Sequence, residues 1–596
     1  MPSRLPPRPL PAALVAALLA VALGTAPLVA PGSAAAQDAP PPPAETEGDA
    51  REPETRPEDL EVFVDTVDVR VVNVDVYVTD KKGEPVTGLT RDDFELLEDR
   101  KPVPITNFYV VEEGRPRGDA AGAPQIADLP VPPPAVPGTI AAPAVPEEQR
   151  LHLIVYVDNF NIRPANRNRV LREIGFFLSA HVDREDRVML VSYDRSLNVR
   201  RPFTSDPRLV AAALEELERL TGHAVSRDDE RRRALEQVDE AGSVGQAVSY
   251  ARMHAESMEN DLRFTVGALK EMIDTLAGLP GRKAILYVSD GLPMVPGQDV
   301  YYAVDARFGA QGGSGVLTDS FGYDASREFR DLANAANANR VSFYTIDAAG
   351  LRLQSSFAAE NARPSASVLV DSTYNSNHQS PLRYLADTTG GQAIVNTNRV
   401  LPGLEKIARD FDTYYSLGFS PTHAANGRYY GLQVRVKGRR DLVVRHREGY
   451  RDKSVEARMT DGTIAALHFA YESNPLSARL SFSGAQPHQD RLYRVAVDVE
   501  VPIGSLVLVP RGDTHEARLR LYIAARDDEG DSSPVQQVTV PISIPSDEVE
   551  KARGQLYRYS LPLLMRPGPH RVAVGLRDDL GGQESFVTGS VTPGRG

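Results

Sequence analysis

The sequence predicts an open α/β sheet flanked by β modules, and three observations support this fold class. Leu151–Asn161 reads LHLIVYVDNFN, an unbroken apolar run that ends in an aspartate. A strand that is apolar on both faces is typical of the centre of a parallel sheet. Similar strands ending in an aspartate recur at Arg187–Asp194, Lys283–Gly291 and Val341–Gly350. Segments with helical spacing, such as Asn166–His181, alternate with them, as expected for a Rossmann-like sheet with helices on both faces.

The composition limits the classes of protein to which the chain can belong. With 596 residues it is too long for one core, so three or four domains are expected. The net charge of −14 argues against a nucleic-acid-binding protein, which needs a basic face. The chain has no cysteine, which excludes disulfides, zinc–thiolate sites and a cysteine nucleophile.

Residues 1–36 have the pattern of a signal peptide. Arg4 and Arg8 precede the apolar stretch Leu10–Ala30, and Ser33–Ala36 offers small residues for cleavage. The alternative is an uncleaved membrane anchor, but glycine and proline interrupt the apolar run. No other segment approaches the ~18 apolar residues of a membrane helix. We therefore expect an exported protein without a membrane span after cleavage, either periplasmic or extracellular.

The rest of the chain divides by composition into linkers and three folded parts. Residues 37–60 and 114–150 are rich in proline and read as linkers. Within residues 61–113, β-branched apolar residues alternate with polar ones, and this pattern predicts a small β domain. Residues 151–450 form the α/β domain, whose last strand is expected at Tyr414–Phe419. Residues 454–592 read as an all-β sandwich that begins with a strand at Ile464–Phe469.

Two insertions interrupt the α/β pattern. Residues 222–260 are highly charged and predict a solvated helix, with a partner-binding helix as the alternative. Residues 294–325 directly follow the strand that ends at Asp290 and are expected to be a loop at the edge of the sheet. Tyr301, Tyr302 and Tyr323 in this loop are candidate contact residues. Tyrosines that pack locally within the loop are an equally acceptable interpretation.

The four aspartates that end the strands are the main candidate site. The carboxyl ends of parallel strands meet at one edge of an open sheet, where such folds bind ligands. Asp194 and Asp347 are therefore expected near Asp158 and Asp290, as an acidic cluster that can attract a cation or a basic partner. Asn159 and Asn161, which follow the first strand, are added as binding residues.

Several ordered segments carry a resemblance to a known family. They are VYVTDKKGEPVTGLTRDDFELLED, LVSYD, PFTSDPRLVAAALEEL, RKAILYVSDG, YTIDAAGL, LADTTGGQAI, DTYYSLGFSP and YYGLQVRVKGRRDLVVRHREGY. Over about 61–450 the chain resembles the exported bacterial "VWFA-related Acidobacterial domain" family, whose central domain is of the von Willebrand factor type A (vWA) kind. The resemblance implies a vWA-like fold and a binding function at the carboxyl edge of its sheet.

The resemblance also implies a test for a metal-ion-dependent adhesion site. In that site D-x-S-x-S follows the first strand, a threonine comes from a second loop, and an aspartate follows the fourth strand. Asp158 and Asp290 match the two aspartates, but Phe160 and Ile162 occupy the serine positions and offer no oxygen. We therefore expect a degenerate site, since hard cations require several oxygen ligands.

Three interpretations of the two aspartates stay open from the sequence. Magnesium could be held by the two carboxylates and retained water. Asn159 and Asn161 could add amide oxygens, although they do not stand at the serine positions of the motif. Thr221 is a loose candidate for the threonine of the second loop. Alternatively, Asp158 and Asp290 could accept hydrogen bonds from nearby backbone or pair with an arginine such as Arg163, so no cofactor is assigned.

The sequence gives little support for an enzyme. It lacks G-x-S-x-G, H-E-x-x-H, a phosphate-binding glycine loop and a dinucleotide fingerprint. We expect a non-catalytic binding or adhesion-type protein with an unknown protein partner. The alternatives are a structural or assembly factor of the cell envelope that acts through its β domains and, with less support, a hydrolase that uses the acidic crevice.

Overall fold

A computed structural model describes residues 70–112, 114–117, 150–181, 186–222, 224–312, 315–352 and 368–594, all within one compact unit, Thr66–Gly596. The predicted signal peptide (1–36), the linker at 37–60, the first residues of the 61–113 unit and most of the 114–150 linker lie outside these ranges. Within the described ranges, no helix is long and apolar enough to cross a membrane.

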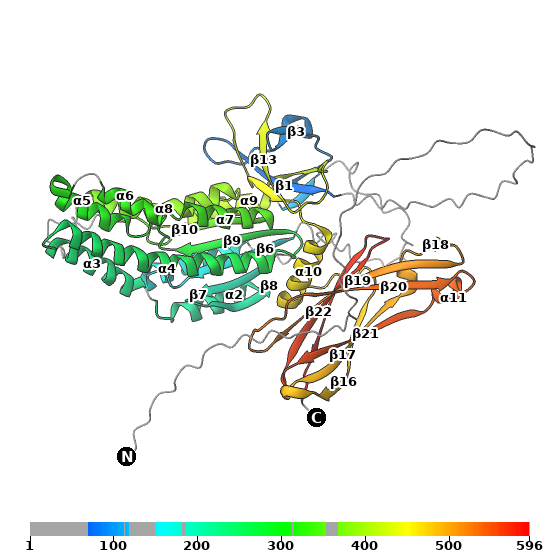
Figure 1. Ribbon diagram of the computed structural model, residues 1–596. Coiled ribbons are helices and arrows are strands. Elements are labelled where there is room, and N and C mark those ends of the chain that lie inside the picture. Colours follow the sequence, from blue (N-terminus) through cyan, green and yellow to red (C-terminus); the bar gives the residue numbers. More distant parts are fainter. Residues whose placement is uncertain are drawn as a thin grey trace, which may run out of the picture. The chain divides into compact units, whose positions relative to one another are not determined.

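The centre of the α/β domain is a six-stranded sheet with mostly parallel strands (Figure 1). Five neighbouring strands run parallel, and the edge strand β8 is antiparallel to β7. This confirms the predicted mixed α/β class with its largely parallel sheet. In spatial order the strands are β11 (Ala393–Ile394), β10 (Val341–Asp347), β9 (Arg282–Ser289), β6 (Leu151–Asp158), β7 (Arg187–Tyr193) and β8 (Leu197–Thr204).

Helices cover both faces of this sheet because its strands are apolar on both sides. All eight residues of β6 are buried, and so are all eight of β9. One face packs on α1 (Pro164–His181), α2 (Pro207–Glu218) and α9 (Leu401–Asp412). The other face packs on α4 (Val244–Leu276), α7 (Ser326–Ala338) and α8 (Val368–Thr388). The two faces thus form two separate apolar cores on one sheet.

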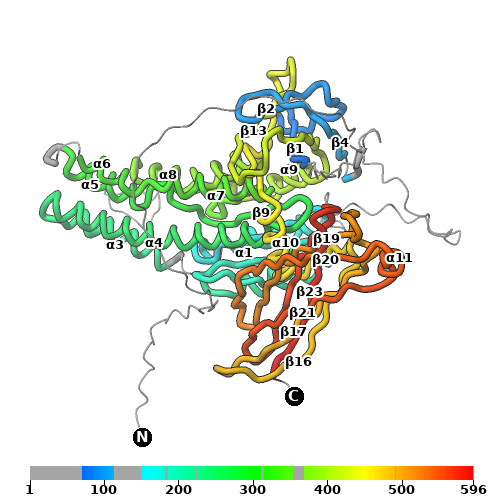
Figure 2. Tube along the Cα trace, turned by 45° about the vertical axis from the view of Figure 1, so that its right-hand side comes forward, coloured from blue at the N-terminus to red at the C-terminus, as the bar shows by residue number. Residues whose placement is uncertain are grey.

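The two predicted insertions pack together into one helical extension. It consists of α3 (Ala224–Glu240), the first half of α4, α5 (Gln298–Gly312), α6 (Val316–Ser320) and the 3-10 turn η4 (Phe321–Tyr323). Figures 1 and 2 show α3, α5 and α6 gathered at one end of the domain. Alanines at positions 247, 251 and 255 line one face of α4, spaced four apart, and allow close approach. The expected loop at 294–325 is therefore helical.

The strand pairing corrects the predicted boundary of the first β unit. β1 (Val72–Thr79) pairs with β12 (Tyr414–Phe419), which was expected to be the last strand of the α/β sheet. Two sheets share one core in which residues from before and after the α/β domain mix. The first sheet is β14 (Val443–His446), β1, β12, β4 (Asn107–Glu112) and β5 (Arg115–Arg117); the second is β15 (Gly449–Arg451), β13 (Tyr429–Val436), β2 (Phe94–Glu98) and β3 (Lys101–Val103).

The C-terminal part begins with a helix rather than with the expected strand at Ile464–Phe469. Helix α10 (Val455–Phe469) starts at Ser454, whose hydroxyl accepts a 3.2 Å hydrogen bond from the Ala457 amide. Two antiparallel sheets with a common core follow. They comprise β16 (Arg479–Pro487), β17 (Tyr493–Pro502) and β21 (Leu556–Met565), and β18 (Val509–Arg511), β19 (Thr514–Asp527), β20 (Gln536–Pro545), β22 (His570–Asp578) and β23 (Glu584–Val591); the short helix α11 (Val549–Ala552) follows β20.

Candidate functional site

Asp158, at the carboxyl end of β6, is fully buried and has hydrogen bonds on both carboxylate oxygens. The Asn161 amide nitrogen donates to Oδ1 at 3.1 Å, and the Asn161 side-chain nitrogen donates to Oδ2 at 2.8 Å. The Tyr287 hydroxyl donates to Oδ2 at 2.5 Å. Burial raises the pKa of this carboxyl, and these hydrogen bonds oppose the rise. Asp158 thus holds the turn after β6.

Asp290, which follows β9, is half-buried and is also occupied by neighbouring donors. The Arg163 amide donates to Oδ2 at 2.9 Å, and the Asn166 side chain lies 3.0 Å from both oxygens. Burial raises the pKa of Asp290 from 3.8 to about 6, because desolvation of the carboxylate outweighs these hydrogen bonds. Asp290 therefore connects the end of β9 to the beginning of α1.

Asp347, at the end of β10, is buried beside an arginine. The Arg352 guanidinium donates to Oδ1 at 3.0 Å, and the Gln379 side chain donates to Oδ2 at 2.7 Å. The same Arg352 nitrogen lies 2.5 Å from the Asp290 carbonyl oxygen. Arg352 consequently links the carboxyl ends of β9 and β10.

Asn159 and Asp194 lie at the neighbouring end of the sheet, between β6 and β7. The Asn159 side-chain nitrogen donates to the Thr221 carbonyl at 2.9 Å and lies 3.4 Å from an Asp194 carboxylate oxygen. Its side-chain oxygen accepts a hydrogen bond from the buried Arg167. Thr221 takes part through its main chain. These contacts hold the loops together and leave Asn159 buried.

Tyr301, which was predicted to contact a partner, instead lies inside the helical extension. Tyr301 is fully buried in the core of the helical extension, 6.3 Å from the ring of Tyr323. Burial raises its pKa to about 12. Tyr302 is half-buried on the same helix, α5. The interpretation in which these tyrosines pack locally agrees with the position of Tyr301, because α5 needs an apolar face to pack on α4.

The residues present do not fit the divalent cation that the family resemblance implies. Phe160 and Ile162, at the two serine positions, are buried apolar side chains. The carboxylates of Asp158, Asp290 and Asp347 already accept hydrogen bonds from the protein. Among the residues that the structure describes, no group of three or more His, Cys, Asp or Glu side chains has metal-binding geometry. A cation needs several free oxygens in one place, and this edge of the sheet does not bring them together.

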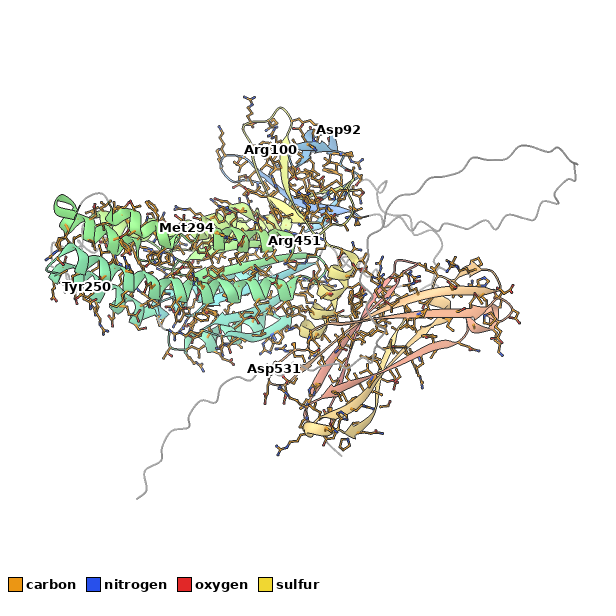
Figure 3. The ribbon with its side chains drawn as sticks, viewed as in Figure 1. Asp92, Arg100, Tyr250, Met294, Arg451 and Asp531 are labelled. Carbon is orange, nitrogen blue, oxygen red and sulfur yellow. The ribbon has the colours of Figure 1, made fainter. Side chains whose placement is uncertain are left out.

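A cavity of about 380 Å³ covers the same edge of the sheet. Its floor is formed by the residues after β6, β9 and β10, and its walls by α3, α4 and α8. Met294, which follows β9 in the sequence, is labelled in Figure 3 among the helices of the domain. The charged and aromatic lining residues are Arg163, Arg227, Arg231, Arg352, His254, His378, Tyr374, Asp228, Glu230, Asp261, Asp290 and Asp371.

Most acidic groups around this cavity are paired with basic ones. Arg163 lies 2.6 Å from Asp228. Arg231 lies 2.6 Å from Asp299 and 3.6 Å from Asp371, and its guanidinium is 4.2 Å from the centre of the Tyr374 ring. These pairs fix the helical extension onto the sheet and orient guanidinium groups along the cavity wall.

Three buried nitrogens on the cavity-lining residues have no hydrogen-bond partner among the described residues. They are Nε2 of His254, one Nη of Arg231 and Nε of Arg352. Burial lowers the pKa of His254 and, strongly, that of His378, so both rings are neutral at physiological pH. A buried donor without an acceptor costs free energy, so the cavity is best matched by a group that brings acceptor oxygens.

From the sequence we identified Asn161, Arg163 and Asp290, which line the cavity, but missed the residues of its helical walls. Arg227 and Arg231 are four residues apart and therefore lie on one face of α3, which the charge pattern alone assigned to solvent. His254 on α4 and Tyr374 and His378 on α8 showed no spacing signal. They meet only because the two insertions fold together over the sheet.

No protein-family model matches the chain, and no curated protein matches it. Among solved structures, an aerotolerance-related membrane protein from Bacteroides fragilis is 12% identical, with a TM-score of 0.22 over 44% of this chain and 98% of that one. BatB from Bacteroides thetaiotaomicron is 12% identical, with a TM-score of 0.19 over 44% and 96%. The PilB minor pilin from Streptococcus sanguinis is 9% identical, with a TM-score of 0.22 over 45% and 64%.

Proposed function

We propose that this chain is an exported, non-catalytic binding protein that docks a protein partner in the cavity at the carboxyl edge of a vWA-like sheet. The observation that carries the proposal is the cavity itself, built over the carboxyl ends of β6, β9 and β10 from basic and aromatic side chains. Open α/β sheets bind ligands at this edge, and the order of parallel strands is compatible with the vWA resemblance of the sequence.

The binding would be direct and would need no metal. In the adhesion site of vWA domains a cation connects the protein to a ligand, whereas here the strand-end carboxylates are hydrogen-bonded and the serine positions hold Phe160 and Ile162. Nε of Arg352 has no hydrogen-bond partner among the described residues in the same place, and one Nη of Arg231 has only the Asp371 carboxylate, 3.6 Å away. A carboxylate side chain of the partner supplies acceptor oxygens that suit guanidinium groups.

We also propose that the chain is not an enzyme, because the strand-end carboxylates of Asp158 and Asp347 are buried and hydrogen-bonded. A hydrolytic pair needs one carboxyl group free to approach substrate or water. Asp158 is fully buried under hydrogen bonds from Asn161 and Tyr287, and Asp347 is engaged by Arg352 and Gln379. Neither group is accessible for that role in this arrangement.

Site-specific photocrosslinking of the full chain tests the docking site. Leu351 lines the cavity and is 60% exposed, so a benzoylphenylalanine at this position reaches a bound partner. Leu564, 54% exposed on β21, is the matched position in the C-terminal part. In an envelope extract of the source cell, we expect one defined crosslinked protein from position 351, lost in Arg352→Gln.

The outcome also separates this proposal from an assembly factor that acts through its β domains. A crosslink obtained only from position 564 would assign the contact to the C-terminal part and would contradict docking at the cavity. A crosslink from position 351 that persists in Arg352→Gln and Arg231→Gln would leave the cavity as the location but would contradict recognition by guanidinium groups.

A further inference from the structure

A second cavity, of about 330 Å³, lies at the amino-terminal end of the central sheet. Its walls come from the beginning of β1, the turn between α4 and β9, the beginning of β9, the end of α7, the segment around β15, α10 and the beginning of β23. Arg451, the last residue of β15, is labelled in Figure 3, and it precedes α10 in the sequence. This cavity shares no residue with the docking cavity, so its function is a separate question.

The lining of this cavity is strongly basic in a chain that is acidic overall. Seven basic and three acidic side chains line it, an excess of four basic groups, whereas the whole chain carries a net charge of −14. The basic residues are Arg70, Lys283, Arg340, Arg447, Arg451, Lys453 and Arg458, and the acidic residues are Asp452, Asp461 and Glu584. Such a concentration of one sign focuses a field on the enclosed volume.

All three acidic residues already have a basic partner. Asp452 pairs with Arg70. Asp461 lies 2.5 Å from Lys453, and Glu584 lies 3.8 Å from Arg458. The remaining four basic side chains have no carboxylate within ion-pair distance among the described residues; they are Lys283, Arg340, Arg447 and Arg451. The positive excess is therefore not neutralised by the protein around it.

Two of these four side chains are buried and donate only to main-chain carbonyls. Lys283 is 4% exposed, and its ammonium donates to the Leu279 carbonyl at 2.7 Å. Arg447 is 9% exposed and donates to the carbonyls of Asn337 and Asn73 at 2.9 and 2.8 Å. Burial and the neighbouring cations, Arg340 among them, lower the pKa of both groups, that of Arg447 to about 10. Buried charges without counter-charges are unfavourable, and an anion would relieve this.

The half-exposed Arg340 and the exposed Arg451 border the same cavity and complete the arrangement. Arg340 follows α7 with a left-handed backbone, φ 56°, which is rare for a residue with a side chain. Guanidinium groups offer several donors in a planar fork that matches phosphate oxygens. The volume lies at the lower end of the range for small-molecule sites, about 300–1,000 Å³.

We propose that this cavity binds a soluble multivalent oxoanion of the phosphate class, held by Arg340, Arg451 and Lys283 within the field of Arg447. The anion would supply the counter-charge that the protein lacks and would join residues from the first β part, the α/β domain and α10. The proposal is independent of the docking function, because the two cavities are lined by different residues.

The test is isothermal titration and thermal unfolding of the full chain with inorganic phosphate and pyrophosphate, against sodium chloride of equal ionic strength. We expect saturable heat and a melting temperature that rises with phosphate beyond the chloride control, because a ligand of the folded state stabilises it. The double variant Arg340→Gln/Arg451→Gln should bind at least about tenfold more weakly, since each lost charge-assisted hydrogen bond costs about 1.5–3 kcal/mol, and tenfold is 1.4 kcal/mol.

Arg440→Gln is the matched control, because it removes the same charge from an exposed arginine that does not line the cavity. It should bind pyrophosphate as the unmodified chain does. Equal shifts in phosphate and chloride, or a phosphate response that the double variant retains, would overturn the proposal. Binding to phosphatidylglycerol vesicles without a response to either soluble anion would also overturn it, in favour of a membrane surface.

Discussion

Replacing Asp290 by asparagine should make stability less dependent on pH, and the size of the effect follows from its burial. Its pKa is raised from 3.8 to about 6 in the folded chain. Between these values the unfolded chain has already released the proton that the folded chain still holds. Stability therefore falls as pH rises from about 4 to about 6. At about 1.36 kcal/mol per pKa unit, the loss amounts to about 3 kcal/mol.

Asparagine is a suitable replacement because it has the shape of the carboxylic acid and no charge. Its oxygen can keep the hydrogen bond from the Arg163 amide, while the Asn166 side chain can rotate to accept from its nitrogen. A change of 1 kcal/mol shifts the melting temperature of a 150–250-residue domain by about 2–4 °C. The variant should therefore melt about 6–12 °C above the unmodified chain at pH 7.5, and about 2–4 °C above it at pH 4.5, where about 1 kcal/mol of the loss has already occurred.

Differential scanning calorimetry of both proteins at several pH values between 4.5 and 7.5 measures this difference. Asp324→Asn, in which the changed carboxylate is exposed to solvent, is the control, and its melting temperature should stay parallel to that of the unmodified chain. If the unmodified chain loses no stability relative to Asp290→Asn between pH 4.5 and 7.5, burial does not raise the pKa of Asp290. In that case the carboxylate is not desolvated.

Two further predictions concern contacts that join the parts of the chain. Asp410→Ala should lower the free energy of unfolding by about 3–5 kcal/mol, measured by urea titration, because it leaves the guanidinium of Arg445, now 2.6 Å from Asp410, without its counter-charge. Gly278→Ala should lower the melting temperature, because the added Cβ would lie 2.1 Å from the main-chain oxygen of Asp461 on α10. Gly267→Ala, with open space around the new methyl group in α4, should instead be neutral or stabilising by up to about 1 kcal/mol.

The sequence was sufficient for elements whose pattern is local. The apolar runs of β6 and β9 indicated buried parallel strands, because only a sheet covered on both faces accommodates them. Asp206 is of a residue type that commonly begins helices, and its side chain accepts a 2.9 Å hydrogen bond from the Arg208 amide at the start of α2. The strand-end aspartates Asp158, Asp290 and Asp347 do lie at the carboxyl edge of the sheet, where Asp290 lines a cavity.

The sequence was insufficient where partners are distant or patterns are short. Alternation identified Val72–Thr79 as a strand, but nothing local indicated that it pairs with Tyr414–Phe419, more than 300 residues later. Ile464–Phe469 is a short apolar run that fits a strand or a buried helix, and only its continuation from Ser454 decides for the helix. The cavity arginines were hidden because their face of α3 is covered by residues from elsewhere in the chain.

Thermal unfolding of the full chain with magnesium, manganese or calcium tests most directly the claim that the crevice acts through its own side chains. Phe160 and Ile162 bring no oxygen, and the carboxylates of Asp158 and Asp290 are hydrogen-bonded. We expect no change in melting temperature at millimolar metal beyond that of sodium chloride at equal ionic strength, in the unmodified chain and in Asp158→Asn alike. A saturable rise with one metal that disappears in Asp158→Asn would contradict the account and would establish a metal-dependent adhesion site.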